Sequence, residues 1–258
     1  MKTLVSRILP CCILAALAAC SNGIDKPLVT AKGTDAYRAS LDEAVRDMDK
    51  RQIAAFDWAV SNLSIETLNA RYPNQSARKI IAGEADAVLK EAPERIAGLE
   101  QEMAAWASAA QEISKVTAGD LSFRLEKDFF GLQPIIRTTI HNGSKHGYST
   151  LHWYAELYLD GATKPAASAE LIDLYKDQGG LKPGDQQIRD FKVGFVSGED
   201  EWKTIEIQKA SQRAAKLVVI PESAQDFGDR LIAGPSPQKT LADLKTNLEV
   251  AQQIKRDL

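Results

Sequence analysis

Cysteine is scarce in this sequence of 258 residues and is confined to its first twenty positions. The three cysteines are Cys11, Cys12 and Cys20, so the rest of the chain carries no thiol. An intrachain disulfide or a thiolate metal site in the part that follows is therefore excluded, even in an oxidising compartment. The length suffices for one large or two ordinary domains, which hydrophobic packing alone has to stabilise.

The sequence also lacks a block of basic residues. It contains 32 Lys and Arg against 35 Asp and Glu, a formal net charge of −3. Lys2 and Arg7 both lie in the first ten residues, and without them the balance is 30 against 35. A mildly acidic chain with interspersed charges disfavours nucleic acid or an anionic lipid surface as a partner.

Motifs that carry known chemistry are missing as well. There is no His-Glu-x-x-His run for zinc and no Gly-x-Ser-x-Gly nucleophile elbow. Gly179-Gly180 precedes no predicted helix that would complete a phosphate loop. The three histidines, His141, His146 and His152, all lie near one predicted hairpin.

These polar residues leave a few alternatives to weigh. His141 and His152 could lie on neighbouring strands, but a metal needs three or four converging ligands. Ser144 or Ser149 could pair with His146 as a dyad, although proximity in a loop does not establish geometry. Four acids could act as paired carboxylates, namely Asp160, Asp173, Asp177 and Asp185. Scattered polar positions are commoner than such sites, so we predict no enzyme, catalytic residue, metal ligand or cofactor.

An apolar run follows the first few residues. It extends from Ile8 to Ala19 and is too short to span a bilayer, but it suits the core of a signal peptide. The run ends in Leu17-Ala18-Ala19-Cys20. This motif resembles the lipobox of bacterial lipoproteins. The resemblance implies that residues 1–19 are a signal peptide that is removed, and that Cys20 carries a thioether-linked diacylglycerol. A further fatty acid such as palmitate can be added to the new amino group.

The same resemblance implies a location. Two or three acyl chains hold a protein firmly at a membrane, because each buried methylene contributes about 0.8 kcal/mol. In Gram-negative lipoproteins, Asp after the cysteine implies retention in the inner membrane, but Ser21 follows here. The implied location is therefore the cell outer membrane, facing the periplasm, a distinction without meaning in a Gram-positive host. The alternative is an ordinary secretory signal with a chance cysteine. Residues 20–33 predict a lipidated tether that lets the folded part stand off from the membrane.

Residues 34–115 have the spacing of amphipathic helices. Apolar residues recur at steps of three and four from Tyr37 to Leu63, and Thr34 is a suitable cap. Ser40-Leu41-Asp42-Glu43 has the form of a capping box, but it lies inside this pattern.

Two prolines divide the rest of this helical range. Pro73 interrupts the pattern, after which Ser76 can cap a second helix. Pro93 suits the first turn of a third helix, which ends near Ser114. Three amphipathic helices joined by short turns predict a three-helix antiparallel bundle.

Part of this range resembles a family of short uncharacterised bacterial envelope lipoproteins. The resemblance is carried by Ser40-Leu41, by Phe56-x-x-Ala59-Val60-x-x-Leu63-Ser64 and by Ser76-Ala77-x-x-Ile80-Ile81. It covers less than a fifth of the chain and includes no known catalytic residue. It therefore implies a lipoprotein and gives no indication of chemistry.

Residues 116–234 change to the alternation of β-strands. Strands are predicted over 121–125, 135–140, 150–160, 169–174, 187–193, 204–208 and 215–220. Turn signals at Asn142-Gly143-Ser144, Asp160-Gly161 and Leu181-Lys182-Pro183-Gly184-Asp185 separate them, and Pro221 is expected to end the last strand. Short strands without intervening helices predict an antiparallel β-sandwich.

The strand pattern looks like the immunoglobulin-like domains of bacterial envelope proteins. The likeness rests on Asn142-Gly143-Ser144, on the strand that contains Trp153 and on Leu181-x-Pro183-Gly184. It implies that Trp153 lies on a central strand and faces the other sheet. The disulfide of antibody domains is missing, as the cysteine positions require.

Residues 235–258 predict a C-terminal helix, because Leu241, Leu244, Leu248 and Ile254 form an apolar stripe. Such a helix is marginal alone, so we expect it to pack on the helical or the β part. The predicted class is α+β: a three-helix bundle, then an immunoglobulin-like sandwich, then this helix.

Three hypotheses for function follow. The first is a membrane-anchored envelope lipoprotein that acts as a non-enzymatic binding or interaction module for an envelope protein or cell-wall component. The second is a periplasmic carrier or sensor of a small apolar ligand, held between the two parts. The third is a hydrolase that uses the loop around His146.

Overall fold

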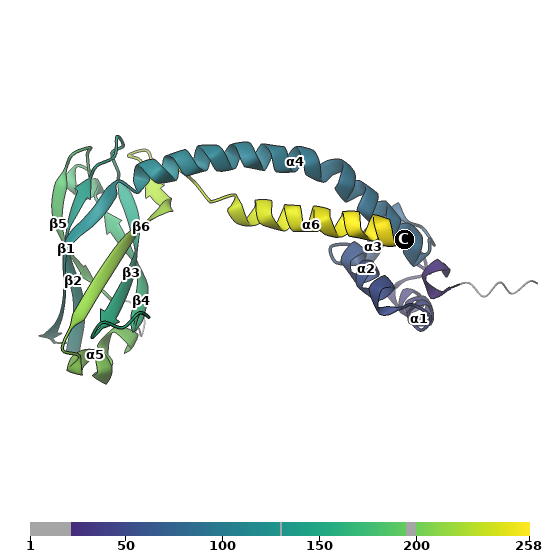
Figure 1. Cartoon of the computed structure of the whole chain (residues 1–258), viewed down its shortest axis with the longest axis horizontal. Helices are drawn as coiled ribbons and strands as arrows, with labels where there is room; N and C mark the ends of the chain where they lie inside the picture. Colours follow the sequence, from purple (N-terminus) through teal and green to yellow (C-terminus); the bar gives the residue numbers. More distant parts are fainter. Residues whose placement is uncertain (1–21, 130, 195–199) are drawn as a thin grey trace, which may run out of the picture. The chain divides into compact units, whose positions relative to one another are not determined.

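The computed structural model describes residues 22–129, 131–194 and 200–258. The predicted signal peptide and Cys20 lie outside this range. The chain divides into two compact units (Figure 1). One, called the helical unit here, contains the described residues up to Pro93 together with Lys245–Leu258. The other, the β unit, contains Glu94–Leu244. The class is α+β, in agreement with the prediction.

The helical unit is built from several short helices and parts of two longer ones. They are α1 (Thr34–Val45), α2 (Lys50–Val60), α3 (Ile65–Arg71), the first part of α4 (Ala77–Ile113) and the last part of α6 (Gln238–Asp257). Their buried side chains form one hydrophobic core. It contains Ile24, Leu28, Ala44, Met48, Phe56, Ala59, Leu68, Ala77, Ile80, Ile81, Ala85, Ala251 and Ile254.

The predicted single helix from Thr34 to Leu63 is wrong, because the chain breaks between α1 and α2. Asp49 caps α2, and its carboxylate accepts hydrogen bonds from the N–H groups of Arg51 and Gln52. The Gln52 side chain accepts from the Asp49 N–H in return, which completes a capping box. Gly33, not Thr34, is the N-cap of α1.

The predicted helix boundary at Pro93 is also wrong, and a bundle of three separate helices is not found. Helix α4 runs without interruption from Ala77 to Ile113, with Pro93 inside it. Proline lacks the N–H that would bond to the carbonyl of Leu89 and is costly within a helix. The sequence on both sides is rich in Ala, Leu, Glu and Lys, which are good helix formers, and this outweighs the local cost. The division between the two units falls at this proline, not at residue 115.

The predicted tether belongs, from residue 22 onward, to the helical unit. Ile24 and Leu28 are 1% and 0% exposed and are part of its core. The Leu28 N–H donates to the carbonyl of Gln75 at 3.0 Å, next to a bridge between Pro27 and Ser76. Polar composition suggested a free segment, but two apolar side chains suffice to bury it.

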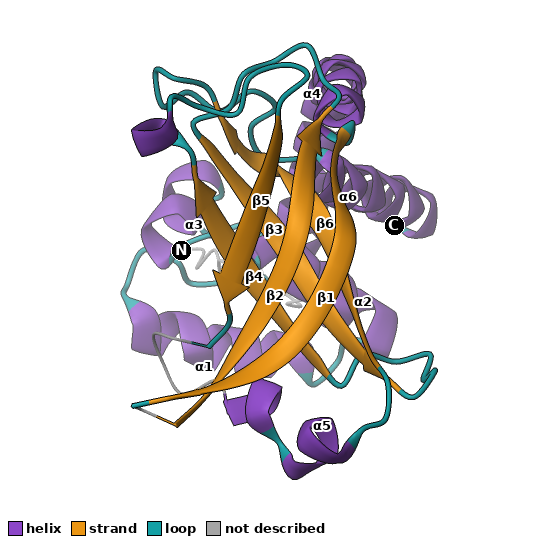
Figure 2. Cartoon of the chain, turned by 90° about the vertical axis from the view of Figure 1, so that its left-hand side faces the viewer, coloured by secondary structure: helices purple, strands orange, loops and turns teal. Residues whose placement is uncertain are grey.

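The β unit contains two antiparallel sheets of three strands (Figure 2). Sheet β1-β2-β5 is formed by β1 (Val116–Asp128), β2 (Gly131–Asn142) and β5 (Gln186–Lys192). Sheet β4-β3-β6 is formed by β3 (Thr150–Leu159), β4 (Ala167–Leu174) and β6 (Arg213–Gln225). The inward residues of both sheets share one hydrophobic core.

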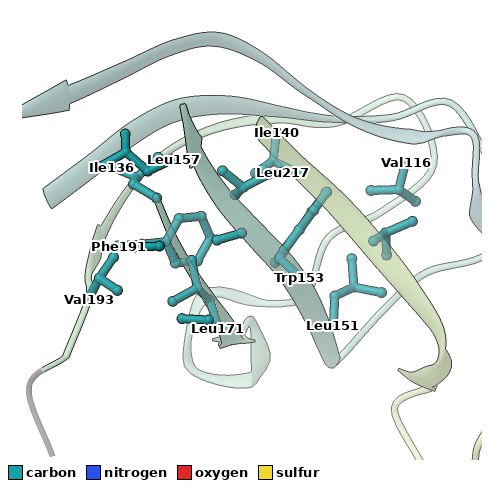
Figure 3. Packing of buried hydrophobic residues seen from close by; sticks show 14 of the residues in the cluster. Val116, Ile136, Ile140, Leu151, Trp153, Leu157, Leu171, Phe191, Val193 and Leu217 are labelled. Atoms are coloured by element: carbon teal, nitrogen blue, oxygen red, sulfur yellow. The ribbon is translucent and has the colours of Figure 1, made fainter. Parts of the chain in front are cut away.

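Figure 3 shows this core, with side chains of both sheets pointing toward one another. Ile136 and Phe191 come from one sheet, and Trp153 and Leu217 from the other. Trp153 is fully buried on β3, the central strand of its sheet, as predicted. On β4 the burial alternates strictly, as period-2 patterning requires.

Two predictions about the strands are wrong. Residues 204–208 are not a strand, because Thr204 caps the short helix α5 (Ile205–Lys209) through a bond from the Ile207 N–H. An Ile-Glu-Ile alternation of this length fits either structure. Strand β6 does not end at Pro221 but continues to Gln225. The register shifts opposite Thr150 and His152, and β6 is an edge strand, where proline is tolerated.

The predicted C-terminal helix is confirmed as α6, whose Ala251 and Ile254 enter the core of the helical unit. Over residues 22–258, apart from 130 and 195–199, no helix is both long and apolar enough to cross a bilayer.

Replacement of Leu28 by Ala tests whether the segment from Asn22 to Thr30 contributes to folding. We expect the free energy of unfolding of the helical unit to fall by about 2–5 kcal/mol, as for other buried leucines. Urea unfolding followed by circular dichroism measures this. The control Lys32→Ala, at an exposed position, should change it by less than about 0.5 kcal/mol. Equal values for the two variants would show that the segment is not part of the fold.

Candidate functional site

The structure separates the histidines that the sequence placed near one hairpin. His141 lies on β2, opposite Thr117 and Gln186, whereas His152 lies on β3 in the other sheet. The expectation of neighbouring strands is therefore wrong. The His152 Nδ1 lies 2.5 Å from Glu170 Oε1, while His141 Nδ1 is buried without a hydrogen-bond partner. Among the described residues no group of three His, Cys, Asp or Glu is arranged to hold a metal ion.

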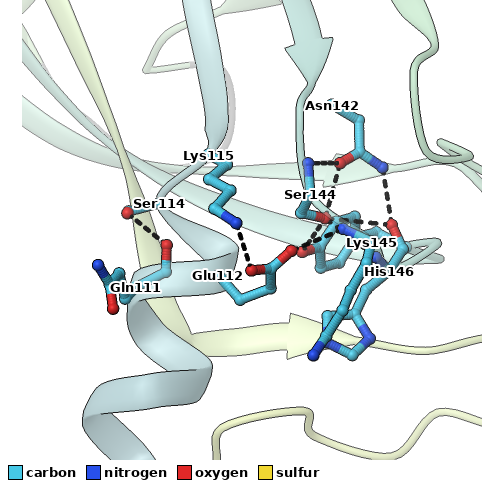
Figure 4. Close-up of polar contacts among 9 residues, drawn as sticks. Gln111, Glu112, Ser114, Lys115, Asn142, Ser144, Lys145 and His146 are labelled. Carbon is cyan, nitrogen blue, oxygen red and sulfur yellow. Dashed lines mark hydrogen bonds and ion pairs between the residues drawn. The ribbon is translucent and has the colours of Figure 1, made fainter.

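The serines near His146 use their hydroxyls to hold the loop. Ser144 Oγ lies 2.8 Å from Asn142 Oδ1 and 2.8 Å from the Tyr148 hydroxyl, and it accepts from the main-chain N–H of His146 (Figure 4). Ser149 Oγ donates to the Asp226 carbonyl at 2.5 Å. Both serines are buried. These bonds connect Ser144 to the main chain of His146 and fix a turn, and none of those to Ser144 uses the imidazole.

A second contact ties this loop to the end of α4. Glu112 accepts a hydrogen bond from the Lys145 N–H at 2.8 Å and one from Lys115 Nζ at 2.6 Å (Figure 4). The Lys115 ammonium, followed by the Lys145 N–H, lowers the pKa of the Glu112 carboxyl. The loop is therefore fixed to the end of α4, and its polar groups serve a structural role.

The acids considered as a carboxylate pair are scattered. Asp173 on β4 is opposite Leu151 at the start of β3, whereas Asp160 follows the end of β3, about 30 Å along the strand. Asp160 accepts from the Gln212 N–H, and Asp185 accepts from the Lys182 N–H in the predicted turn. Asp177 lies in a short 3-10 turn. Asp160 and Asp173 do not meet as a catalytic pair.

Asp173 instead forms a buried ion pair inside the β unit. Its side chain is 1% exposed and contacts the guanidinium of Arg189 on β5. The Arg189 guanidinium also lies 5.0 Å from the centre of the Tyr175 ring, a cation–π contact. This pair connects β4 of one sheet to β5 of the other, so it fixes how the two sheets meet at this end.

The environment of Asp173 is poor in compensating hydrogen bonds. Its Oδ2, the Tyr175 hydroxyl and the Trp153 indole N–H are all buried and lack a hydrogen bond of normal geometry. Burial raises the pKa of the Asp173 carboxyl, and Arg189, Tyr175 and Trp153 oppose the shift only in part. Burial also raises the pKa of the Tyr175 hydroxyl. Asp173 and Tyr175 are buried while Arg189 is 18% exposed, so the carboxylate is out of reach of a substrate and the cluster suits a structural role.

The outer face of sheet β4-β3-β6 carries exposed apolar side chains, which we call the outer-face patch. Tyr154, Ile172, Leu174 and Val218 compose it, with exposures of 44%, 61%, 61% and 47%. Tyr154 is directly opposite Val218, and Ile172 is diagonal to Tyr154 across β3 and β4. The patch therefore has two parts on one face of the sheet: Tyr154 with Val218, and Ile172 with Leu174, which are two residues apart on β4.

Polar pairs lie within and next to the outer-face patch. His152 and Glu170 meet between Ile172 and Tyr154, and Lys216 Nζ lies 3.0 Å from Glu156 Oε2 one row further along. The Lys216 ammonium lowers the pKa of the Glu156 carboxyl. Exposed apolar side chains interspersed with polar ones are common at protein interaction surfaces.

The helical unit contains a groove between α2 and the end of α6. Its volume is about 460 Å³. Apolar parts of Ile24, Ala55, Trp58, Val250 and Ile254 line it. The Trp58 indole N–H donates to Asn247 Oδ1 at 2.7 Å, which fixes the ring. Such a groove can take a slender apolar ligand.

Comparison with protein-family models, with curated proteins and with solved structures finds no match to this chain.

The outer-face patch was not predicted, although the sequence contains its signal. The alternation of β3 assigns Tyr154 to the outward face. The signal in Ile172 and Val218 is visible only once the register places them beside Tyr154. The groove gives no local signal, since its walls are far apart in the chain.

The Asp173 carboxyl should make stability depend on pH. Because its pKa in the folded state is raised above the ordinary 3.8, the folded protein keeps a proton that the unfolded chain loses. The unfolding free energy of the wild type, relative to Asp173→Asn, should therefore fall as pH rises from below 3.8 through the raised pKa, and then level off.

Urea unfolding from pH 3 to 7 measures this difference. Asp190→Asn is the control, because that carboxylate is exposed and pairs with Arg124 and Arg137, so its removal should cost less than about 1 kcal/mol. A difference that rises with pH would mean that the Arg189 pair outweighs burial.

Proposed function

We propose that this protein is a lipid-anchored bacterial envelope protein that acts as a non-enzymatic interaction module. Lipid on Cys20 holds it at the membrane, and the outer-face patch binds an envelope protein. In this proposal the β unit is an immunoglobulin-like sandwich used for binding. The proposed location is the outer membrane, facing the periplasm, on the basis of Ser21.

The anchor is supported by the sequence motif Leu17-Ala18-Ala19-Cys20 at the end of an apolar run. A diacylglycerol and a further acyl chain bind a bilayer strongly, because each methylene adds about 0.8 kcal/mol. The absence of a basic block agrees with anchoring by lipid instead of by attraction to anionic headgroups.

The observation that carries the binding role is the outer-face patch. Ile172 and Leu174 are each 61% exposed on a strand whose inward residues are buried, so folding of the chain does not use them. Large apolar side chains exposed together on one face mark interaction surfaces in soluble domains. Tyr154 is of the type that most often dominates binding energy at interfaces. An apolar surface of this kind favours a protein over a polysaccharide as the partner.

A second candidate function is a carrier or sensor of a small apolar ligand. The groove between α2 and α6 favours it, although this groove lies within the helical unit and not between the two units as first hypothesised. A hydrolase based on the His146 loop has no comparable support, since the hydroxyls of Ser144 and Ser149 are committed to holding the loop.

Photo-crosslinking in cells tests the proposed function. A photoreactive amino acid at Tyr158, on the same face of β3 and four residues after Tyr154, should give a reproducible adduct with one envelope protein. Ile172→Ser should reduce the adduct about tenfold or more, because a central contact is worth roughly 1–2 kcal/mol. The matched control Ile188→Ser, 64% exposed on the other sheet, should leave it unchanged.

Cys20→Ser belongs to the same experiment. Without lipid the protein should leave the membrane fraction, and the adduct should weaken because the local concentration falls. An adduct insensitive to Ile172→Ser contradicts the patch, whereas membrane attachment that survives Cys20→Ser contradicts the anchor.

A further inference from the structure

The segment immediately after the proposed lipid site is fixed to the helical unit. Gly23 is buried so closely that a Cβ there would lie 2.1 Å from the Ala44 carbonyl oxygen. Ile24 and Leu28 enter the core. Only glycine fits at position 23, so the close approach of the segment to Ala44 depends on this residue.

Polar contacts hold the same segment along its length. Arg78 Nε donates to Asp25 Oδ1 at 2.6 Å, and Lys26 Nζ donates to Asp47 Oδ2 at 2.9 Å. Thr30 donates to Asn69 Oδ1 at 2.8 Å. The Arg78 guanidinium lowers the pKa of the Asp25 carboxyl, so the pair stays charged near neutral pH.

The chain between the lipid and the folded unit is therefore short. Cys20 precedes Gly23 by three residues and Ile24 by four. At about 3.3–3.6 Å per extended residue, the Cα of Cys20 stays within roughly 11 Å of Gly23 and 14 Å of Ile24. A lipid on Cys20 cannot move far from this point of the helical unit.

The groove between α2 and α6 begins at this point, because Ile24 lines it. Ala55 and Trp58 contribute apolar surface from α2, and Val250 and Ile254 from α6. Polar side chains line the groove as well, namely Asp49, Arg51, Gln52, Gln253 and Asp257. All these residues belong to one compact unit, so the groove and the start of the chain keep their relation.

We infer that this groove binds one acyl chain of the lipid on Cys20, an inference that rests on the proposed lipidation. The chain is apolar, slender and tethered within reach of the groove. Tethering makes the encounter intramolecular, so even a weak intrinsic affinity gives high occupancy. The volume of 460 Å³ lies within the usual range of pockets for small apolar ligands.

The partition of the acyl chain between the groove and the bilayer depends on the walls of the groove. An acyl chain that moves from the bilayer into an apolar groove exchanges one apolar environment for another. The gain comes from the walls of the groove, whose apolar surface is removed from water. The remaining chains stay in the bilayer, so the lipid holds the helical unit close to the membrane surface instead of at a distance.

A photoreactive fatty acid incorporated biosynthetically into the lipid provides the test. The full-length protein is placed in phosphatidylethanolamine–phosphatidylglycerol vesicles and irradiated, and its crosslinked peptides are mapped by mass spectrometry. We expect crosslinks from the Cys20 lipid to α2 near Ala55 and to α6 near Val250. Ala55→Phe should fill the groove and reduce them about tenfold. Ala70→Phe on α3, exposed and outside the groove, is the matched control and should leave them unchanged.

Each outcome decides between the alternatives. Intact mass first establishes whether Cys20 carries lipid, and a bare cysteine contradicts the proposed anchor together with this inference. A lipidated protein whose crosslinks reach only vesicle phospholipid overturns the groove inference and leaves the anchor intact. A separate fatty acid or phospholipid in the groove, detected by native mass spectrometry, replaces the proposed occupant and favours the carrier. The wild-type map remains decisive even if Ala55→Phe fails to fold.

Discussion

Burial of Ile24 and Leu28 in the core of the helical unit is the constraint on which the rest of this account depends. It converts residues 22–30 from a linker into part of the folded unit. The ion pairs of Asp25 with Arg78 and of Lys26 with Asp47 also hold this segment against the rest of the helical unit. If Cys20 is held at a membrane, the helical unit is held there as well, because its fold begins only a few residues later.

The sequence predicted elements whose periodic pattern is long and failed where a local exception decides the structure. Strand β3 and helix α6 follow their apolar patterns and were found where expected. Pro93 predicted a boundary, but the helix-forming sequence on both sides carries α4 through it. Asp49 was missed because the apolar spacing continues across the break that its capping box creates. Candidate sites depend on residues brought together from distant strands and helices, so the pattern of a single element could not reveal them.

The two units use buried and exposed groups in contrasting ways. In the β unit, the Asp173–Arg189 pair is enclosed and links the two sheets, while the outer-face patch leaves apolar side chains in water. In the helical unit, the exposed apolar surface is concave and is lined by α2 and α6. Apolar side chains on an open sheet face suit a macromolecule, and an apolar groove suits a slender ligand. This contrast is the physical basis for assigning a protein partner to one and an acyl chain to the other.

Amide hydrogen exchange of the full-length protein tests the docking of the N-terminal segment most directly. The N–H groups of Lys26 and Leu28 donate to the carbonyls of Gly23 and Gln75 at 3.1 and 3.0 Å. The account predicts that both exchange as slowly as amides of the surrounding helical core, because they open only when that core opens. Exchange at the rate of an unstructured peptide would contradict it, since a free segment could not hold the helical unit near its anchor.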